Sequence, residues 1–260
     1  MAFLHNRLGP GSISYLMTKL AGAGLSLSVF FAFILQASGF DLFQWSEEFS
    51  NWMFWGIFFG YGIACSLGID LLTFKIRGLP RLPVKIILYV VAGYAFFIIR
   101  EINGYTLLAG TVGAASALIF YFGTYASRQS PFFKYMFAIG LPLLFLLLGN
   151  IDFTKKADWK EERTDSGYTA SFSYFHGKHE VPVRVEEGRG MTFSVQFQRE
   201  NRGGHGFHVL NEHNKRMSME ETGGGKLRLT APETGVYRIV VTGDGLRGGF
   251  QVLWSVEDDF

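Results

Sequence analysis

The first 150 residues alternate between long apolar runs and short polar connections. A helix needs about 20 apolar residues to cross a hydrocarbon core about 30 Å thick, and most of these runs approach or exceed that length. The pattern therefore predicts a multi-pass domain of five transmembrane helices over residues 1–150. The five runs are Leu16–Ala37, Trp52–Phe74, Pro83–Ile99, Tyr105–Tyr125 and Phe132–Gly149.

Beyond Ile151 the chain becomes polar, and short segments alternate between apolar and polar positions, as in Met191–Gln198. Glycine-rich turns separate several of these segments, an arrangement typical of an all-β sandwich of jelly-roll type. We expect this domain over residues 167–260, joined to the helices by a charged juxtamembrane linker at 151–166. The expected strands are Tyr168–Phe175, Val181–Glu186, Met191–Gln198, Gly206–Asn211, Arg216–Glu220, Lys226–Thr230, Val236–Thr242 and Phe250–Val256.

The connections between the apolar runs alternate in charge. Residues 75–85 carry four Lys or Arg and no acid, and residues 128–134 carry two cations and no acid. Residues 41–48 carry three acids and no cation. Cytoplasmic loops are enriched in Lys and Arg, so the pattern predicts a cytoplasmic N-terminus and an extracytoplasmic C-terminal domain.

The charge balance and the cysteine content exclude two classes of protein, nucleic-acid-binding proteins and proteins with a disulfide-bonded exported domain. Residues 1–150 hold nine Lys and Arg against five Asp and Glu, and residues 151–260 hold fifteen against seventeen. Neither half has the basic stripe of a nucleic-acid-binding protein, so no nucleic-acid partner is expected. The only cysteine, Cys65, lies in the second apolar run, so the C-terminal domain contains no disulfide. An exported domain of this kind is compatible with a bacterial cell surface.

The second apolar run places small residues at successive four-residue steps: Gly56, Gly60, Ala64 and Gly68. Such a face lets helices approach closely. Packing inside the bundle is the first interpretation, and a homo-oligomer or membrane-partner face is the second.

Charged residues within membrane spans often mark transport paths. Asp70 lies about 27 Å along the second helix from Trp52, level with Lys19 and Lys85 at the inner interface. Arg100 and Glu101 end the third helix on the opposite side. We expect interfacial or pairing roles for these residues, with a substrate path as the alternative.

One stretch of the C-terminal domain resembles a known family. The run Lys226–Gly243, which contains Gly235-Val236-Tyr237, and the segment Gly249–Trp254 are similar to the last strands of bacterial pre-peptidase C-terminal domains. Val185–Phe193 resembles the strand, acidic-glycine turn and strand of the same family. The resemblance covers about 80 residues of the C-terminal half. It implies a small exported sandwich with a binding or targeting role and no catalytic residues.

Five of the six histidines fall within residues 176–213. His176 and His179 form one His-x-x-His pair, and His205 and His208 form a second, so zinc or copper ligation is one interpretation. Dispersed surface histidines are the other, because positions three apart on a strand point to opposite faces. No required cofactor is predicted. A pH-sensing surface is a further interpretation.

Catalytic motifs are absent from the sequence: it has no Gly-x-Ser-x-Gly, phosphate loop or His-Glu-x-x-His. The pattern therefore favours a non-enzymatic integral protein of the bacterial cytoplasmic membrane. Its extracytoplasmic sandwich is expected to bind a ligand, a wall component or a partner protein. The alternative is a small transporter or channel subunit capped by the sandwich.

Overall fold

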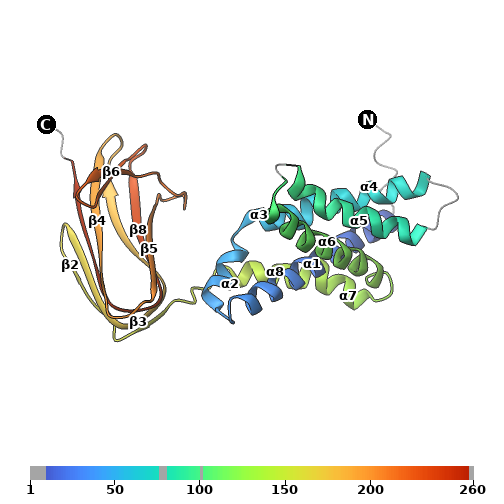
Figure 1. Ribbon diagram of the computed structural model, residues 1–260, viewed down its shortest axis with the longest axis horizontal. Helices are drawn as coiled ribbons and strands as arrows, with labels where there is room; N and C mark the ends of the chain where they lie inside the picture. Colours follow the sequence, from blue (N-terminus) through green and yellow to red (C-terminus); the bar gives the residue numbers. More distant parts are fainter. Residues whose placement is uncertain (1–9, 76–80, 100–101, 258–260) are drawn as a thin grey trace. The chain divides into compact units, whose positions relative to one another are not determined.

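The computed structural model describes residues 10–75, 81–99 and 102–257, and the chain divides into two compact units, Met1–Asp152 and Phe153–Phe260 (Figure 1). The first unit is helical and the second is an antiparallel sheet. The helices and π-helical segments are α1 (Pro10–Ala37), α2 (Leu42–Phe49), α3 (Trp52–Trp55), η1 (Gly56–Tyr61), α4 (Gly62–Lys75), α5 (Arg81–Ile98), α6 (Gly104–Ala126), α7 (Pro131–Tyr135), η2 (Met136–Gly140) and α8 (Leu141–Leu148).

Four helical runs in the described chain are long and apolar enough to cross a membrane: Ser12–Ala37, Trp52–Phe74, Gly104–Ala126 and Pro131–Leu148. The second and fourth of these runs each contain a π-helical segment, η1 and η2. The remaining apolar helix, Leu82–Ile98, is shorter. At 1.5 Å per residue it extends about 26 Å, less than the hydrocarbon thickness of about 30 Å. The count of five spans therefore stays a prediction.

Glycines let the helices of this unit approach closely, because a Cβ would collide with backbone. At Gly24 it would overlap the carbonyl of Phe137 in η2, and at Gly22 it would lie 2.7 Å from the carbonyl oxygen of Phe120 in α6. At Gly93 of α5 it would lie 2.5 Å from the backbone nitrogen of Ala114 in α6. The helices α5 and α6 run side by side in Figure 1.

The segment between the first two apolar runs differs from the expected loop. Asp41 accepts hydrogen bonds from the amides of Phe43 and Gln44 and thereby starts α2. Trp45 of α2 donates its indole N–H to the carbonyl of Phe31 (2.8 Å). Trp55 also donates its indole N–H to a backbone carbonyl, and both indoles pack within the helical unit.

The second unit is one antiparallel sheet of eight strands. The strands are β1 (Lys155–Ala157), β2 (Lys160–Arg163), β3 (Gly167–Val185), β4 (Gly190–Arg199), β5 (Gly204–Leu210), β6 (Glu220–Gly223), β7 (Lys226–Thr230) and β8 (Gly235–Val256). The order is β1-β3-β8-β4-β7-β6, while β2 pairs with β3 and β5 pairs with β8. The two longest strands, β3 and β8, run side by side (Figure 1).

Two expected turns lie within continuous strands. The expected strands Tyr168–Phe175 and Val181–Glu186 fall within β3 or reach its end, and the two from Val236 to Val256 are parts of β8. Glycines with positive φ, Gly177 (128°) and Gly248 (117°), allow bends there without ending the pairing. Residues Arg216–Glu220 do not form a strand of their own, because Arg216 makes only an isolated bridge to Leu210.

The segment 151–166, expected as a linker, contributes strands to the sheet. Residues Lys155–Ala157 and Lys160–Arg163 both pair with β3. Between them, Trp159 stacks on Phe172 with ring centroids 5.1 Å apart. A half-buried aromatic contact and backbone pairing thus hold this charged segment against the domain, which begins at Phe153.

Candidate functional site

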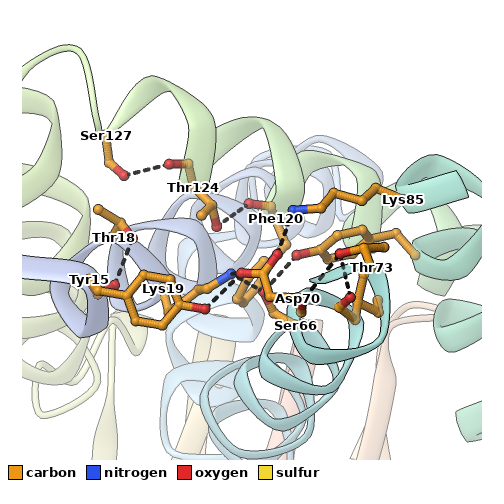
Figure 2. A network of polar contacts seen from close by, with 12 residues as sticks. Tyr15, Thr18, Lys19, Ser66, Asp70, Thr73, Lys85, Phe120, Thr124 and Ser127 are labelled. Carbon is orange, nitrogen blue, oxygen red and sulfur yellow. Dashed lines mark hydrogen bonds and ion pairs between the residues drawn. The ribbon is translucent and has the colours of Figure 1, made fainter. Parts of the chain in front are cut away.

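Three helices of the first unit bring ionisable side chains together. Lys19 of α1 donates to Asp70 Oδ2 of α4 (2.6 Å), and Lys85 of α5 donates to Asp70 Oδ1 (2.6 Å). The hydroxyl of Tyr15 also donates to Asp70 Oδ2 (2.7 Å). Figure 2 shows the two ammonium groups reaching the carboxylate from different helices. We call this arrangement the Lys19–Asp70–Lys85 cluster.

The spacing of the polar residues explains why they meet. Side chains four apart lie on one helix face, and each helix carries such a pair. These pairs are Tyr15 and Lys19 on α1, Ser66 and Asp70 on α4, Lys85 and Tyr89 on α5, and Thr124 and Arg128 at the end of α6.

Lys19 is the most enclosed member of the cluster. Its side chain is 1% exposed, and its ammonium donates to Ser66 Oγ (2.7 Å) as well as to Asp70. Ser66 Oγ in turn shares a hydrogen bond with the hydroxyl of Tyr89 (2.6 Å). A buried ammonium without such partners would cost several kcal/mol, so Asp70 and Ser66 are needed to keep Lys19 in place.

A small polar pocket lies beside this cluster. It has a volume of about 50 Å³ and is lined by residues of α1, α4 and α5 and by residues at the end of α6. Its lining comprises Lys19, Asp70, Lys85, Tyr89, Tyr121, Thr124, Tyr125 and Arg128. Three of these side chains are cationic and one is anionic, so the lining carries a net charge of +2.

A larger, apolar cavity of about 700 Å³ lies in the same helical unit. Helix α1, the second helical run, α5 and α6 line it, mainly with phenylalanines and small residues. Tyr61 donates to the carbonyl of Ala92 (2.6 Å) inside this lining, so its hydroxyl is satisfied. Tyr89 lines both the cavity and the polar pocket.

The sequence placed Asp70 level with Lys19 and Lys85 and indicated interfacial or pairing roles, but it did not indicate the other residues that complete the site. The structure places Asp70 in ion pairs with Lys19 and Lys85, and Lys19 is buried rather than extended toward an interface. Tyr15, Ser66 and Tyr89 were missed, although their four-residue spacing from the charged residues is a visible signal. Arg100 and Glu101 lie outside the described residues.

The small-residue face of the second helical run does not pack inside the bundle. A Cβ at Gly56, Gly60 or Gly68 would meet no atom within 4 Å, and Ala64 is exposed. The expected packing is therefore wrong at these residues. The opposite side of α4, with Ser66 and Asp70, faces the other helices, and that orientation turns the glycines outward. The oligomer or partner interpretation of this face stays a prediction.

The candidate metal ligands lie on two strands. His205 and His208 belong to β5, where they oppose Gly243 and Val240, so their side chains point to opposite faces. His176 and His179 belong to β3. Among the residues that the structure describes, no three of these four histidines have ligand atoms within 4.8 Å of one another. A zinc or copper site at these histidines stays a prediction.

His179 instead belongs to an aromatic and charged cluster. Its ring lies against Tyr168 (4.9 Å between centroids) and Trp159 (5.1 Å), and its Nδ1 lies 2.8 Å from Lys156 Nζ. An ammonium can only donate there, so Nδ1 accepts and the imidazole is neutral. Burial and, after it, the charge of Lys156 lower the pKa of His179 to about 4.

Glu161 completes this cluster. Its carboxylate accepts hydrogen bonds from the Tyr168 hydroxyl and the Trp159 indole, and these bonds lower the pKa of Glu161. Burial and the neighbouring carboxylate raise the pKa of Tyr168. The arrangement links β2 to β3 through side chains as well as backbone pairing.

No known protein family matches the chain, and no curated protein is similar enough to match it. The resemblance to pre-peptidase C-terminal domains therefore stays a prediction.

Proposed function

We propose that this chain is a non-catalytic bacterial membrane protein that displays its sheet unit at the outer surface of the cytoplasmic membrane. There the sheet unit binds a ligand, a wall component or a partner protein. The observation that carries the proposal is the division of the chain after Asp152. An apolar helical unit precedes that point, and a sheet unit with a separate hydrophobic core follows it.

We further propose that α5 completes a set of five spans. An odd number of spans places the two ends of the chain on opposite sides of the bilayer. The basic residues in 75–85 and 128–134 then lie inside, and the acids in 41–48 lie outside.

For the sheet unit we propose a two-layer, jelly-roll-like sandwich related to pre-peptidase C-terminal domains. Support comes from the way β8 changes partner along its length. Its first part pairs with β5 and its second part with β4, while β3 accompanies both. A bend between the two parts would fold the sheet over its core.

The partly buried acids of the sheet unit have structural partners, which supports a non-catalytic role. Glu180 pairs with Arg238 (3.1 Å), and Glu233 accepts from the Asn211 amide (3.1 Å). The exposed Glu161 also has structural partners, because it accepts hydrogen bonds from Tyr168 and Trp159. Catalytic carboxylates are instead aimed into a site where substrate can reach them.

The orientation is tested by cysteine labelling in a Cys65→Ala background. Ser166 and Gln129 are both exposed and lie in the two different units, so they form a matched pair of positions. An impermeant thiol reagent on intact cells should label Ser166→Cys and leave Gln129→Cys unlabelled until the cells are opened. Labelling of Gln129→Cys alone would invert the proposed topology.

Binding by the sheet unit is tested with a photo-crosslinking residue in the full-length protein. Leu253 is exposed on the sheet unit (43%), and Leu108 is exposed on α6 (67%). We expect a discrete adduct from position 253 in intact cells. Adducts from position 108 only, or none from position 253 and from the similarly exposed Val236, would contradict binding by the sheet unit.

The second candidate is a small transporter or channel subunit. It is favoured by one observation, the charged cluster beside a cavity in the helical unit. A substrate flux into vesicles that is lost in Asp70→Asn and kept in Glu48→Gln would support it. Equal flux in vesicles with and without the protein would contradict it.

A further inference from the structure

The polar pocket has more positive than negative charge. Lys19, Lys85 and Arg128 line it, and Asp70 is the only acid in the lining. The other acids that the structure describes in the helical unit are Asp41, Glu47 and Glu48, on or beside α2, and Asp152, which follows α8, and none of them lines the pocket. No described side chain therefore neutralises the remaining charge of +2. An anion from outside the chain would do so, whereas a cation would be repelled.

The lining of the pocket is suited to a phosphate group. Ammonium, guanidinium and hydroxyl groups are its donors, and bonds from charged donors to phosphate oxygens are among the strongest hydrogen bonds in proteins. The ammonium of Lys19 is held in place by hydrogen bonds to Ser66 and Asp70. Lys85 is 23% exposed and Arg128 is exposed, so a headgroup can reach the pocket.

An apolar space adjoins this pocket. Tyr89 lines both, and its hydroxyl bonds to Ser66 on the side of the charged cluster. Along α6 the cavity lining runs from Thr106 to Phe120, about 21 Å at 1.5 Å per residue. Its volume of about 700 Å³ falls within the range of about 300–1,000 Å³ typical of ligand pockets.

We propose that the pocket and the cavity form one site for a phosphate-bearing anionic lipid. The phosphate group binds at Lys85 and Arg128, and the hydrocarbon chain passes Tyr89 into the cavity. The two spaces together select an amphiphile, because the pocket alone would accept a free anion and the cavity alone any lipid chain. This site is independent of what the sheet unit binds.

The first test measures the thermal unfolding of the full-length protein in a neutral detergent. The added probes are dioleoyl phosphatidylglycerol, dioleoyl phosphatidylcholine and inorganic phosphate. We expect a rise in midpoint that saturates with phosphatidylglycerol and is much smaller with phosphatidylcholine. Equal shifts with the two lipids would overturn the proposal. A shift from inorganic phosphate as large as that from phosphatidylglycerol would show a free-anion site and also overturn it.

The headgroup contact is tested by Arg128→Gln against Lys134→Gln. Both residues are cations near the same end of the bundle, but Lys134 contacts Ser14 and does not line the pocket. We expect Arg128→Gln to weaken phosphatidylglycerol binding about tenfold, the effect of losing one charge-assisted bond. Lys134→Gln should change it less than about twofold. The same loss in both variants would indicate general attraction to charge and contradict a specific site.

The chain contact is tested by Ala109→Trp, which fills part of the cavity, against Leu108→Trp on the exposed face of the same helix. Phosphatidylglycerol binding should fall only in Ala109→Trp. If that variant unfolds early without lipid, Ala117→Phe replaces it, since Ala117 also lines the cavity. Unchanged binding in a folded cavity variant would rule out the chain position.

Discussion

The two units of this chain differ in how many polar side chains they bury. Of nine buried polar or charged residues among those described, eight lie in the helical unit and only Asn211 lies in the sheet unit. The sheet core is built from aliphatic and aromatic side chains such as Phe175, Ile239 and Phe250. In water, burial of apolar surface drives such a core together.

Four helical runs of the first unit are long and apolar enough to cross a membrane. Helices that do so lack this driving force, because lipid tails are as apolar as the side chains. Close approach at glycines and interhelical hydrogen bonds replace it. Gly93 against α6 and the Lys19–Asp70–Lys85 cluster are examples of the two devices. The comparison teaches that buried polar contacts and close approach at glycines add to apolar packing in the helical unit, whereas the sheet core consists almost entirely of apolar side chains.

The largest effect is expected from Asp70→Asn. It removes the carboxylate between two ammonium groups and leaves Lys19 buried without a counter-charge, which costs about 3–5 kcal/mol. Thermal unfolding of the helical unit in detergent measures the loss. Glu48→Gln, at the other end of the unit, is the control and should change stability by less than about 0.5 kcal/mol. Equal stability of both variants would show that the ion pairs of Asp70 do not stabilise the helical unit.

Trp159→Ala should destabilise the sheet unit by about 2–3 kcal/mol. The indole is half-buried and stacks on Phe172, so the cost is somewhat below that of a fully buried aromatic residue. Denaturant unfolding followed by far-UV circular dichroism measures it, with the partly exposed Tyr174→Ala as control. A wild-type midpoint in Trp159→Ala would show that residues 151–166 do not contribute to the stability of the sheet unit.

Gly113→Val should cost about 1–3 kcal/mol, because a Cβ there would lie 2.5 Å from the carbonyl oxygen of Gly93 and α5 would have to move away. Gly60→Val is the matched control on the open face, where a Cβ meets nothing within 4 Å. Both changes place a β-branched residue in a helix, so the difference between them isolates helix packing. A larger loss of stability in Gly60→Val than in Gly113→Val would show that the small-residue face of the second helical run packs inside the bundle after all.

The smallest effect is the pH dependence from His179. Its pKa is lowered from 6.5 to about 4 in the folded protein, so between these values the unfolded chain binds a proton that the folded chain does not. Stability is therefore complete above about pH 6.5 and falls as the pH decreases toward 4, by about 1–2 kcal/mol at pH 5.

Denaturant midpoints at pH 7 and pH 5 measure this change. His179→Gln should flatten the profile, and the exposed His213→Gln should leave it unchanged. A profile that is identical in His179→Gln and the unaltered protein would show that other groups cause the acid sensitivity.

The sequence by itself determined the division into an apolar helical half and an antiparallel strand-rich half. Runs of apolar residues and strict alternation in Met191–Gln198 report burial through local periodicity, which needs no knowledge of partners. It also indicated Asp70, because a charge in an apolar run is conspicuous. The positions of β4, β5 and β7 followed from the same alternation.

Only the tertiary structure decided which glycines allow close approach. Gly56, Gly60 and Gly68 carry the familiar spacing but face outward, while Gly24 and Gly93 meet other helices. Spacing defines a face, and the rotation of the helix about its axis, set by contacts such as Ser66 with Lys19, decides what that face meets. The sequence also did not predict that pairs of expected strands join into β3 and β8. A glycine can either end a strand or bend it, and the strand that pairs with it decides which.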